Sequence, residues 1–184
     1  MKVSGKIIQI DKDEKNPLRQ EARLIKKDEF GTEYLKNIIE TMTSSLAKES
    51  DGVALAAPQI ALSLSIFVIA PSAYSESAKW KPLVFINPRI TKISKKTAVM
   101  QEGCLSVRWI YGKTNRSIAA TVEAYDVEGN KFSYGATGLV AHIFQHEIDH
   151  LHGTLFIDHG FDFEEFTEEE MIEAEKKRKE ESSK

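Results

Sequence analysis

Apolar residues recur at helical spacing in two long segments of the chain. The first segment runs from Thr32 to about Lys48 and has one apolar and one polar face, as expected of an amphipathic helix. Its apolar stripe consists of Tyr34, Leu35, Ile38, Ile39, Met42 and Leu46. The second segment follows Thr137 and Gly138 with an apolar run and reaches Gly153, a residue suited to ending a helix in the left-handed conformation. The pattern therefore predicts two amphipathic helices.

Short apolar runs bounded by Pro, Gly and polar residues predict β-strands between these helices. The predicted strands cover residues 66–70, 83–87, 119–125 and 131–134. A mostly polar loop, residues 71–81, joins the first two strands. The turn sequence Glu128-Gly129-Asn130 joins the last two strands, which we therefore expect to form a hairpin.

The end of the chain carries the pattern of one more helix. Thr167 and Glu170 have the spacing of a capping box, and the acidic first turn and basic last turn that follow complement the helix dipole. The elements together predict an α+β fold, with mixed or antiparallel short strands around a central helix and a C-terminal helix. We expect one domain over residues 1–184, in which about residues 165–184 form the C-terminal helix and tail.

Composition narrows the classes of protein that the chain can represent. The formal net charge of −3 gives no basis for non-specific binding to DNA through charge. A single cysteine excludes an internal disulfide framework and suits a reducing compartment. The sequence has no apolar run long enough to span a membrane, and residues 1–6 lack the apolar region of a secretion signal. We therefore expect a cytoplasmic location with no membrane partner.

The second helix carries the motif His146-Glu147-x-x-His150. Residues four apart lie on one face of a helix, so the two histidines can hold one metal ion, with Glu147 beside them to move the protons of a water molecule. The alternative interpretation is a pair of hydrogen-bonded core histidines. A carboxylate next to a buried histidine pair is costly unless it is paired or functional, which favours the metal site.

A catalytic site of this kind needs a third protein ligand. The extended motif that places a histidine three residues after Gly153 fails here, because that position is Phe156. His142 lies one turn before the first ligand, where a third ligand would be strained, so we expect it to line a cleft or to be partly exposed. Downstream carboxylates form another source: Glu164, Glu165, Glu168, Glu169 and Glu170. The only cysteine, Cys104, lies in a polar, glycine-containing turn that suits a thiolate ligand.

Three segments carry a family resemblance. In chain order they are GVALAAPQ at residues 52–59, EGCLS at residues 102–106 and QHEIDHLHG at residues 145–153. Together they resemble the three signature motifs of peptide deformylase, a metal-dependent hydrolase that removes the formyl group from the N-terminal formylmethionine of newly made proteins. VFINP at residues 84–88 and LFID at residues 155–158 extend the resemblance over most of the chain.

The resemblance implies a role for each motif residue. The implied metal ligands are Cys104, His146 and His150. Glu147 would act as general base and then general acid for a water molecule activated by the metal. The side-chain amide of Gln59 and the backbone N–H of Leu105 would stabilise the oxyanion. Asp149 is expected to be a neighbour of the ligands or a surface partner.

The resemblance also implies a substrate and a cofactor. Formyl-Met peptides and nascent chains are the expected partners, and the C-terminal helix is a candidate contact for the ribosome. The expected substrate-binding residues are Gly52, Val53, Ala54, Gly103, His142 and Ile143. One divalent metal ion is expected, Fe(II) in the cell, and a Cys-His-His ligand set also suits Zn, Ni or Co.

Two positions depart from the family pattern. Ala54 stands where the first motif usually has glycine, and its methyl group narrows the space over a bound peptide. In the family, the second motif is often followed by valine or isoleucine and then by proline, whereas here Val107 is followed by Arg108. Two other functions stay open: a metalloendopeptidase with a downstream glutamate as third ligand, and an inactive homologue that only binds N-termini.

Overall fold

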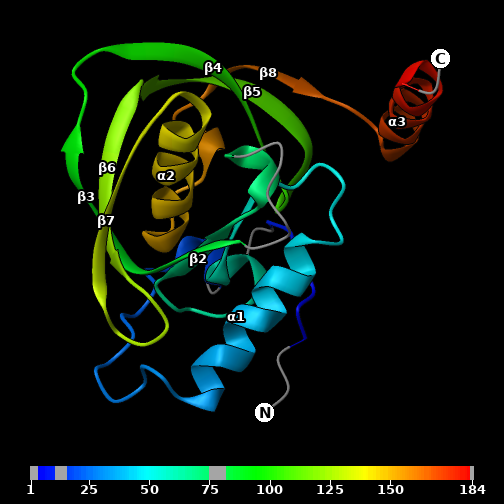
Figure 1. Ribbon diagram of the computed structural model, residues 1–184. Helices are drawn as coiled ribbons and strands as arrows, with labels where there is room; N and C mark the ends of the chain where they lie inside the picture. Colours follow the sequence, from blue (N-terminus) through cyan, green and yellow to red (C-terminus); the bar gives the residue numbers. More distant parts are fainter. Residues whose placement is uncertain (1–3, 11–15, 75–81, 183–184) are drawn as a thin grey trace.

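The fold is described from a computed structural model, which covers residues 4–10, 16–74 and 82–182 (Figure 1). Residues 1–3, and residues 75–81 of the predicted polar loop, lie outside the described residues, and the start of that loop forms a short 3-10 helix, Pro71–Ala73. The helices are α1 (Glu33–Leu46), α2 (Gly138–Leu151) and α3 (Glu168–Ser182). The strands are β1 (Ala54–Ala56), β2 (Ile66–Ile69), β3 (Leu83–Ile93), β4 (Thr97–Cys104), β5 (Val107–Ser117), β6 (Ala119–Tyr125), β7 (Lys131–Thr137) and β8 (Phe161–Glu165).

The strands form two antiparallel sheets. Five strands follow the order β1-β2-β3-β6-β7, which leaves β1 at one edge, and three strands follow the order β4-β5-β8. Figure 1 shows α2 enclosed by the curved strands, with α1 on the far side of β2. The α+β prediction with a central helix is confirmed, and the pairing between strands is antiparallel.

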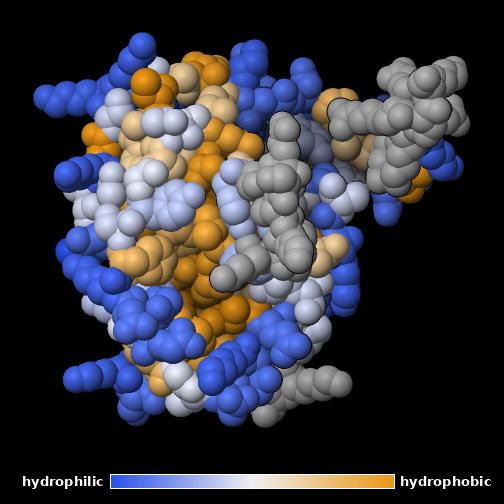
Figure 2. Space-filling model, in the orientation of Figure 1, coloured by the Kyte–Doolittle hydropathy of each residue, from blue (hydrophilic) through white to orange (hydrophobic). Residues whose placement is uncertain are grey.

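The five-stranded sheet is buried on both faces near β2. Ile66 and Val68 point into an apolar cluster with α1, whereas Phe67 and Ile69 point into a second cluster with α2, because successive residues of a strand face opposite ways. This explains why residues 66–69 are apolar without alternation. Figure 2 shows a strip of apolar surface between hydrophilic residues, in the part of the view where Figure 1 draws α2 and β2.

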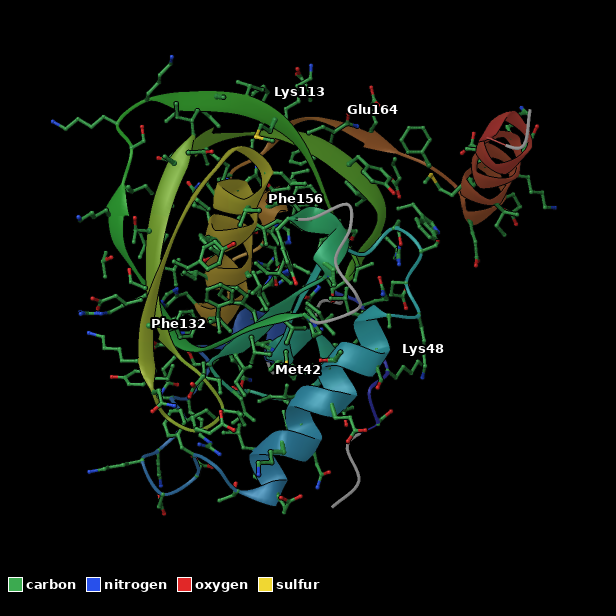
Figure 3. The ribbon with its side chains drawn as sticks, in the orientation of Figure 1. Met42, Lys48, Lys113, Phe132, Phe156 and Glu164 are labelled. Carbon is green, nitrogen blue, oxygen red and sulfur yellow. The ribbon has the colours of Figure 1, made fainter. Side chains whose placement is uncertain are left out.

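Helix α1 follows its predicted apolar stripe closely. The hydroxyl of Thr32 accepts a hydrogen bond from the backbone N–H of Leu35 at 3.3 Å and caps the helix. Leu35, Ile38 and Met42 are fully buried, and Figure 3 shows Met42 directed from α1 toward the sheet. Tyr34, counted in the predicted stripe, is about half exposed because it lies at the margin of the buried face.

Helix α2 packs an aromatic face on the five-stranded sheet. The rings of Phe144 and Phe85 meet edge to face with their centroids 5.2 Å apart, and Phe67 stacks on Phe85 at 4.6 Å. Burial of one such side chain stabilises the fold by roughly 1.5–3 kcal/mol. Because this face fixes the rotation of α2, it also fixes the direction in which the opposite face projects.

The end of α2 is set by a glycine, as predicted. Gly153 has φ +72°, and a β-carbon built there would lie 2.7 Å from the carbonyl carbon of Arg19. Position 153 therefore needs glycine both for its left-handed conformation and for the close approach of another backbone segment.

The start of α3 also matches its prediction, because Thr167 and Glu170 form the reciprocal capping box. In Figure 1, α3 stands away from the sheets at the end of β8.

The strand predictions need correction at several places. Strand β3 continues to Ile93, six residues beyond its predicted end, β7 continues to Thr137, three residues beyond its predicted end, and β4, β5 and β8 were not predicted at all. Cys104, assigned to a turn, is the last residue of β4. Among the described residues, no helix is long and apolar enough to cross a membrane.

Candidate active site and metal centre

The face of α2 opposite the aromatic core carries the H-E-x-x-H motif. His146 and His150 lie one helical turn apart, and their ring centroids are separated by 4.9 Å. His150 and Glu147 are almost completely buried, with 1% and 3% of their surface exposed. The motif therefore lies inside the protein, directed toward β4 and the turn that follows it.

Strand β4 brings the cysteine to the two histidines. The sulfur of Cys104 lies 3.2 Å from Nε2 of His150, and one donor atom from each of Cys104, His146 and His150 lies within 4.8 Å of the others. No other group of three or more such side chains converges in this way in the part of the chain that the structure describes. Two imidazole nitrogens and a sulfur form a ligand set for Zn, Fe, Ni or Co.

The other predicted sources of a third ligand do not join the cluster of Cys104, His146 and His150. Phe156 is a buried apolar residue whose ring stacks near that of His146 at 6.4 Å. Glu164 is exposed on β8, and Figure 3 shows it pointing outward, away from α2. His142 is buried, which excludes the predicted partial exposure, and its Nε2 contacts the carboxylate of Glu102 at 2.6 Å. His142 instead lines a cleft, which was the other alternative predicted for it.

The free atoms of the two histidines fit a metal ion. Nδ1 of His146 lies 2.5 Å from Oε1 of Glu102, and since a carboxylate only accepts, Nδ1 carries the hydrogen and Nε2 is the atom that would bind a metal. Burial lowers the pKa of His146, but hydrogen bonds to Cys104 and Glu102 raise it well above its usual range, so a metal ion would replace a proton at Nε2. Burial, followed by the charge of His146, lowers the pKa of His150 well below its usual range, so this ring is neutral and can coordinate. Nδ1 of His150 and Oε2 of Glu147 are buried and have no hydrogen-bond partner among the described residues.

Glu102 is the functional residue that the sequence analysis missed. Its carboxylate accepts hydrogen bonds from Arg116 at 2.7 Å and from the hydroxyl of Thr114 at 2.5 Å, besides its contacts with His142 and His146. Burial alone would raise the pKa of Glu102, but its hydrogen bonds to His142, His146 and Arg116 outweigh burial and hold it well below its usual range.

The network reaches outward through the arginine. Arg116 also donates to Asp149 at 2.6 Å, so Asp149 is a neighbour of the site and not a ligand, as expected. Glu102 stands two residues before Cys104 in a motif that had already been singled out, and this proximity was the available signal.

The two predicted oxyanion donors lie beside the cysteine. Gln59 is 1% exposed, its Oε1 accepts from the backbone N–H of Ala56 at 2.8 Å, and its Nε2 lies 3.4 Å from the sulfur of Cys104. The carbonyl group of Gln59 is therefore held by β1, which leaves the NH₂ group directed at the ligand cluster. Leu105 follows Cys104 directly and is buried at the wall of the same cleft.

A cleft of about 1150 Å³ opens over this cluster. The six predicted substrate-binding residues all line it: Gly52, Val53, Ala54, Gly103, His142 and Ile143. Trp109, Tyr111 and Phe166, which were not predicted, line its wall as well. The ring of Tyr111 lies so close to Gly103 that a β-carbon there would be 2.7 Å from it.

The fold and the site together define a metal-dependent hydrolase in which one helix supplies two histidines and a glutamate, and a strand end supplies a cysteine. The family model described as polypeptide deformylase matches residues 6–165. The chain therefore belongs to the polypeptide deformylase family, whose members are hydrolases that remove the N-formyl group from newly made proteins.

Individual relatives agree with this assignment. A peptide deformylase of Desulforudis audaxviator is 39% identical over 142 residues, which cover 77% of this chain and 85% of the relative. Peptide deformylase 1B, chloroplastic/mitochondrial, of Arabidopsis thaliana is 38% identical over 82% of this chain, which spans only 54% of that plant protein.

Solved structures show the same fold. The Met-Ala-Ser bound crystal structure of a class I type b peptide deformylase from Acinetobacter baumannii aligns with a TM-score of 0.74 and 27% identity, over 86% of this chain and 99% of that chain. The Thermotoga maritima peptide deformylase aligns with a TM-score of 0.72 and 34% identity, over 84% of this chain and 95% of that chain.

Proposed function

We propose that this chain removes the formyl group from the N-terminal formylmethionine of new proteins and releases formate. The observation that carries the proposal is the convergence of Cys104, His146 and His150 beside the buried Glu147, on the wall of the cleft. The same three residues are the proposed metal ligands. Fe(II) is the proposed metal in the cell, and Zn, Ni or Co can occupy the same ligand set. When bound, the metal acts as a Lewis acid and makes a coordinated water molecule acidic enough to ionise near neutral pH.

Glu147 is the proposed proton carrier. Burial raises its pKa to about 7, and Oε2 has no hydrogen-bond partner among the described residues. A carboxylate with this pKa can take a proton from water at Oε2 and return it to the leaving amine. The amide of Gln59 and the N–H of Leu105 are the proposed donors to the formyl oxygen, where negative charge develops as the carbonyl is attacked.

The peptide is proposed to bind along β1. This strand pairs with β2 on one side only, so its other edge is available for an extended peptide beside residues that line the cleft. The formylmethionine side chain would enter the pocket near His142 and Ile143 on α2. The Met-Ala-Ser complex of the Acinetobacter relative supports a peptide ligand for this cleft.

Formate release from formyl-Met-Ala-Ser by Fe(II), Zn and Ni forms of the protein tests the proposal. The Glu147→Gln variant should keep its metal and lose roughly 10²–10⁴ in rate, the usual contribution of general acid–base catalysis. Glu164→Gln, which changes an exposed glutamate on β8, is the matched control and should behave like the wild type. Turnover of Glu147→Gln near the wild-type rate would exclude Glu147 as the proton carrier.

Three further expectations remain proposals. The chain acts as one catalytic domain, it works in the cytoplasm, and α3 contacts the ribosome near the site where nascent chains emerge. The position of α3 at the end of β8, away from the sheets, leaves it accessible for such a contact. Residues of α3 between Glu168 and Ala174 line the cleft, so the test changes only its exposed basic end. The variant Lys176→Glu with Lys177→Glu should leave formate release from short peptides unchanged and reduce co-sedimentation with ribosomes. Unchanged co-sedimentation would exclude the contact.

A further inference from the structure

Arg108, which replaces the proline frequent in the family, ties two walls of the cleft together. Its guanidinium donates to Asp51 with Nη1 at 2.5 Å and Nη2 at 3.3 Å, and Nη2 also donates to Glu49 at 2.8 Å. The same guanidinium lies over the ring of Trp109, 4.3 Å from its centroid. We call Glu49, Asp51 and Arg108 the rim clamp.

The two segments that the rim clamp joins carry different parts of the site. Glu49 and Asp51 precede the cleft residues Gly52 and Val53, and these lead into β1. Arg108 stands four residues after Cys104, in the segment that supplies a metal ligand and a cleft wall. The clamp therefore sets the distance between the edge strand and the metal-binding segment at the outer rim.

The direction of β1 decides which part of a peptide the clamp affects. At the inner end, Gln59 holds the N–H of Ala56 and contacts Cys104, so this end lies at the metal ligands. At the outer end, the chain passes back through Gly52 to Asp51 and the clamp. A peptide whose first residue lies at the metal reaches the outer end only with its later residues.

The geometry of the clamp differs from that of an ordinary surface ion pair. Only 18% of the Arg108 side chain is exposed, and the contact with Asp51 is bidentate. Arg89, by comparison, pairs with Glu123 on the five-stranded sheet while 70% of its side chain is exposed. Exposed ion pairs such as Arg89–Glu123 do little to hold a chain segment in one position. The Asp51 and Glu49 side chains are 45% and 30% exposed, but the guanidinium itself is largely covered and stacked on a ring, which restricts the motion of the segment that carries its partners.

We propose that Arg108 is a positioning residue that holds residues 51–54 ready to pair with the later residues of a peptide substrate. The proposal rests on the deformylase function proposed above. It predicts that Arg108 lowers KM for peptides that extend beyond the first two residues, with little effect on kcat, because binding at the rim precedes chemistry at the metal.

The test compares formyl-Met-Ala with formyl-Met-Ala-Ser as substrates. In Arg108→Gln, KM for the longer peptide should rise about tenfold, the cost of ordering a few side chains and one loop on binding. KM for the shorter peptide should rise less than about twofold, with kcat and metal content unchanged. Asp51→Asn should reproduce this split, and the double variant should match Arg108→Gln, because both changes break the same contact.

Controls separate positioning from folding and from the function itself. Arg89→Gln removes an exposed arginine and should change neither KM. A lower melting temperature of Arg108→Gln with an unchanged ratio of the two KM values would overturn the proposal. If Arg108→Gln fails to fold, the ratio of the two KM values is measured instead in Asp51→Asn and in Glu49→Gln, which keep the arginine. An unchanged ratio in both variants would overturn the proposal. If the wild type releases no formate, the deformylase function fails, and calorimetric binding of Met-Ala-Ser tests the clamp alone: an equal Kd in wild type and Asp51→Asn would overturn it.

Discussion

The substitution Glu102→Gln tests how the buried network supports the metal centre. Glutamine has nearly the same shape, but it removes the charge that faces Arg116, a side chain with only 7% of its surface exposed. Breaking one partner of a buried ion pair costs about 3–5 kcal/mol. Because Arg116 keeps Asp149 at 2.6 Å, we expect the lower end, about 3 kcal/mol of unfolding free energy.

The same substitution should weaken metal binding by a separate route. His146 loses the carboxylate of Glu102. That carboxylate fixes the hydrogen on Nδ1 of His146 and makes its Nε2 more basic. Loss of such a partner typically costs 10–100-fold in metal affinity. The two effects are measured apart: urea unfolding of the metal-free protein gives the stability, and competition with a chelator gives the affinity for Zn.

The double variant Glu102→Gln with Arg116→Gln distinguishes the two effects. Removing the arginine charge as well should restore part of the lost stability, because no unpaired buried charge remains. It should not restore the metal affinity, since His146 still lacks its carboxylate. A Zn affinity of Glu102→Gln within about twofold of the wild type would refute the assigned role of Glu102 in orienting His146.

Three shorter predictions follow from other parts of the site and fold. Cys104→Ala should bind much less metal in elemental analysis, and full stoichiometric occupancy would rule out the cysteine as a ligand. Ala54→Gly should keep its metal and raise kcat/KM on formyl-Met peptides, with a gain in transition-state binding on the order of 1 kcal/mol. A clear loss of kcat/KM would show that the methyl group is a favourable contact. Gly153→Ala should destabilise the protein by about 2 kcal/mol or more in denaturant unfolding, because it adds a clash with Arg19 to the strain of φ +72°. Gly31→Ala, at φ +71° with no atom within 4 Å of the added carbon, is its control and should cost only about 1 kcal/mol; equal losses would contradict the clash.

The elements that sequence patterns predicted are those in which apolar residues mark the buried face. Helix α1 buries Leu35, Ile38 and Met42 at helical spacing, and its capping residue Thr32 stands where the pattern begins. The metal helix was found through its motif and its terminal glycine. In these elements, local chemistry and tertiary packing require the same residues, so the local pattern was sufficient.

Strand β5 was missed because its buried face is not apolar. Gly112, Thr114 and Arg116 point inward, while the outward positions Lys113 and Asn115 are also polar. Burial alternates along this strand, but hydrophobicity does not, and the alternation of hydrophobicity is the sequence pattern that predicts a half-buried strand. The inward positions are polar because they serve Glu102 and leave room for Phe163, whose ring lies where a β-carbon of Gly112 would be.

The two glutamates of the site show why residue type alone could not assign the roles. Both are nearly buried, Glu102 at 5% and Glu147 at 3% exposed, and both are close to a metal ligand in the sequence: Glu147 directly follows His146, and Glu102 lies two residues before Cys104. Glu102 contacts an arginine and two histidines, so its pKa lies well below its usual range and it stays a permanent anion that orients His146. Glu147 has burial without such partners, so its pKa rises to about 7 and it can exchange a proton. Arg116, supplied by a strand that the sequence did not predict, separates the anchor from the acid–base group, because it forms hydrogen bonds with Glu102, whereas its charge lowers the pKa of Glu147 less than burial raises it.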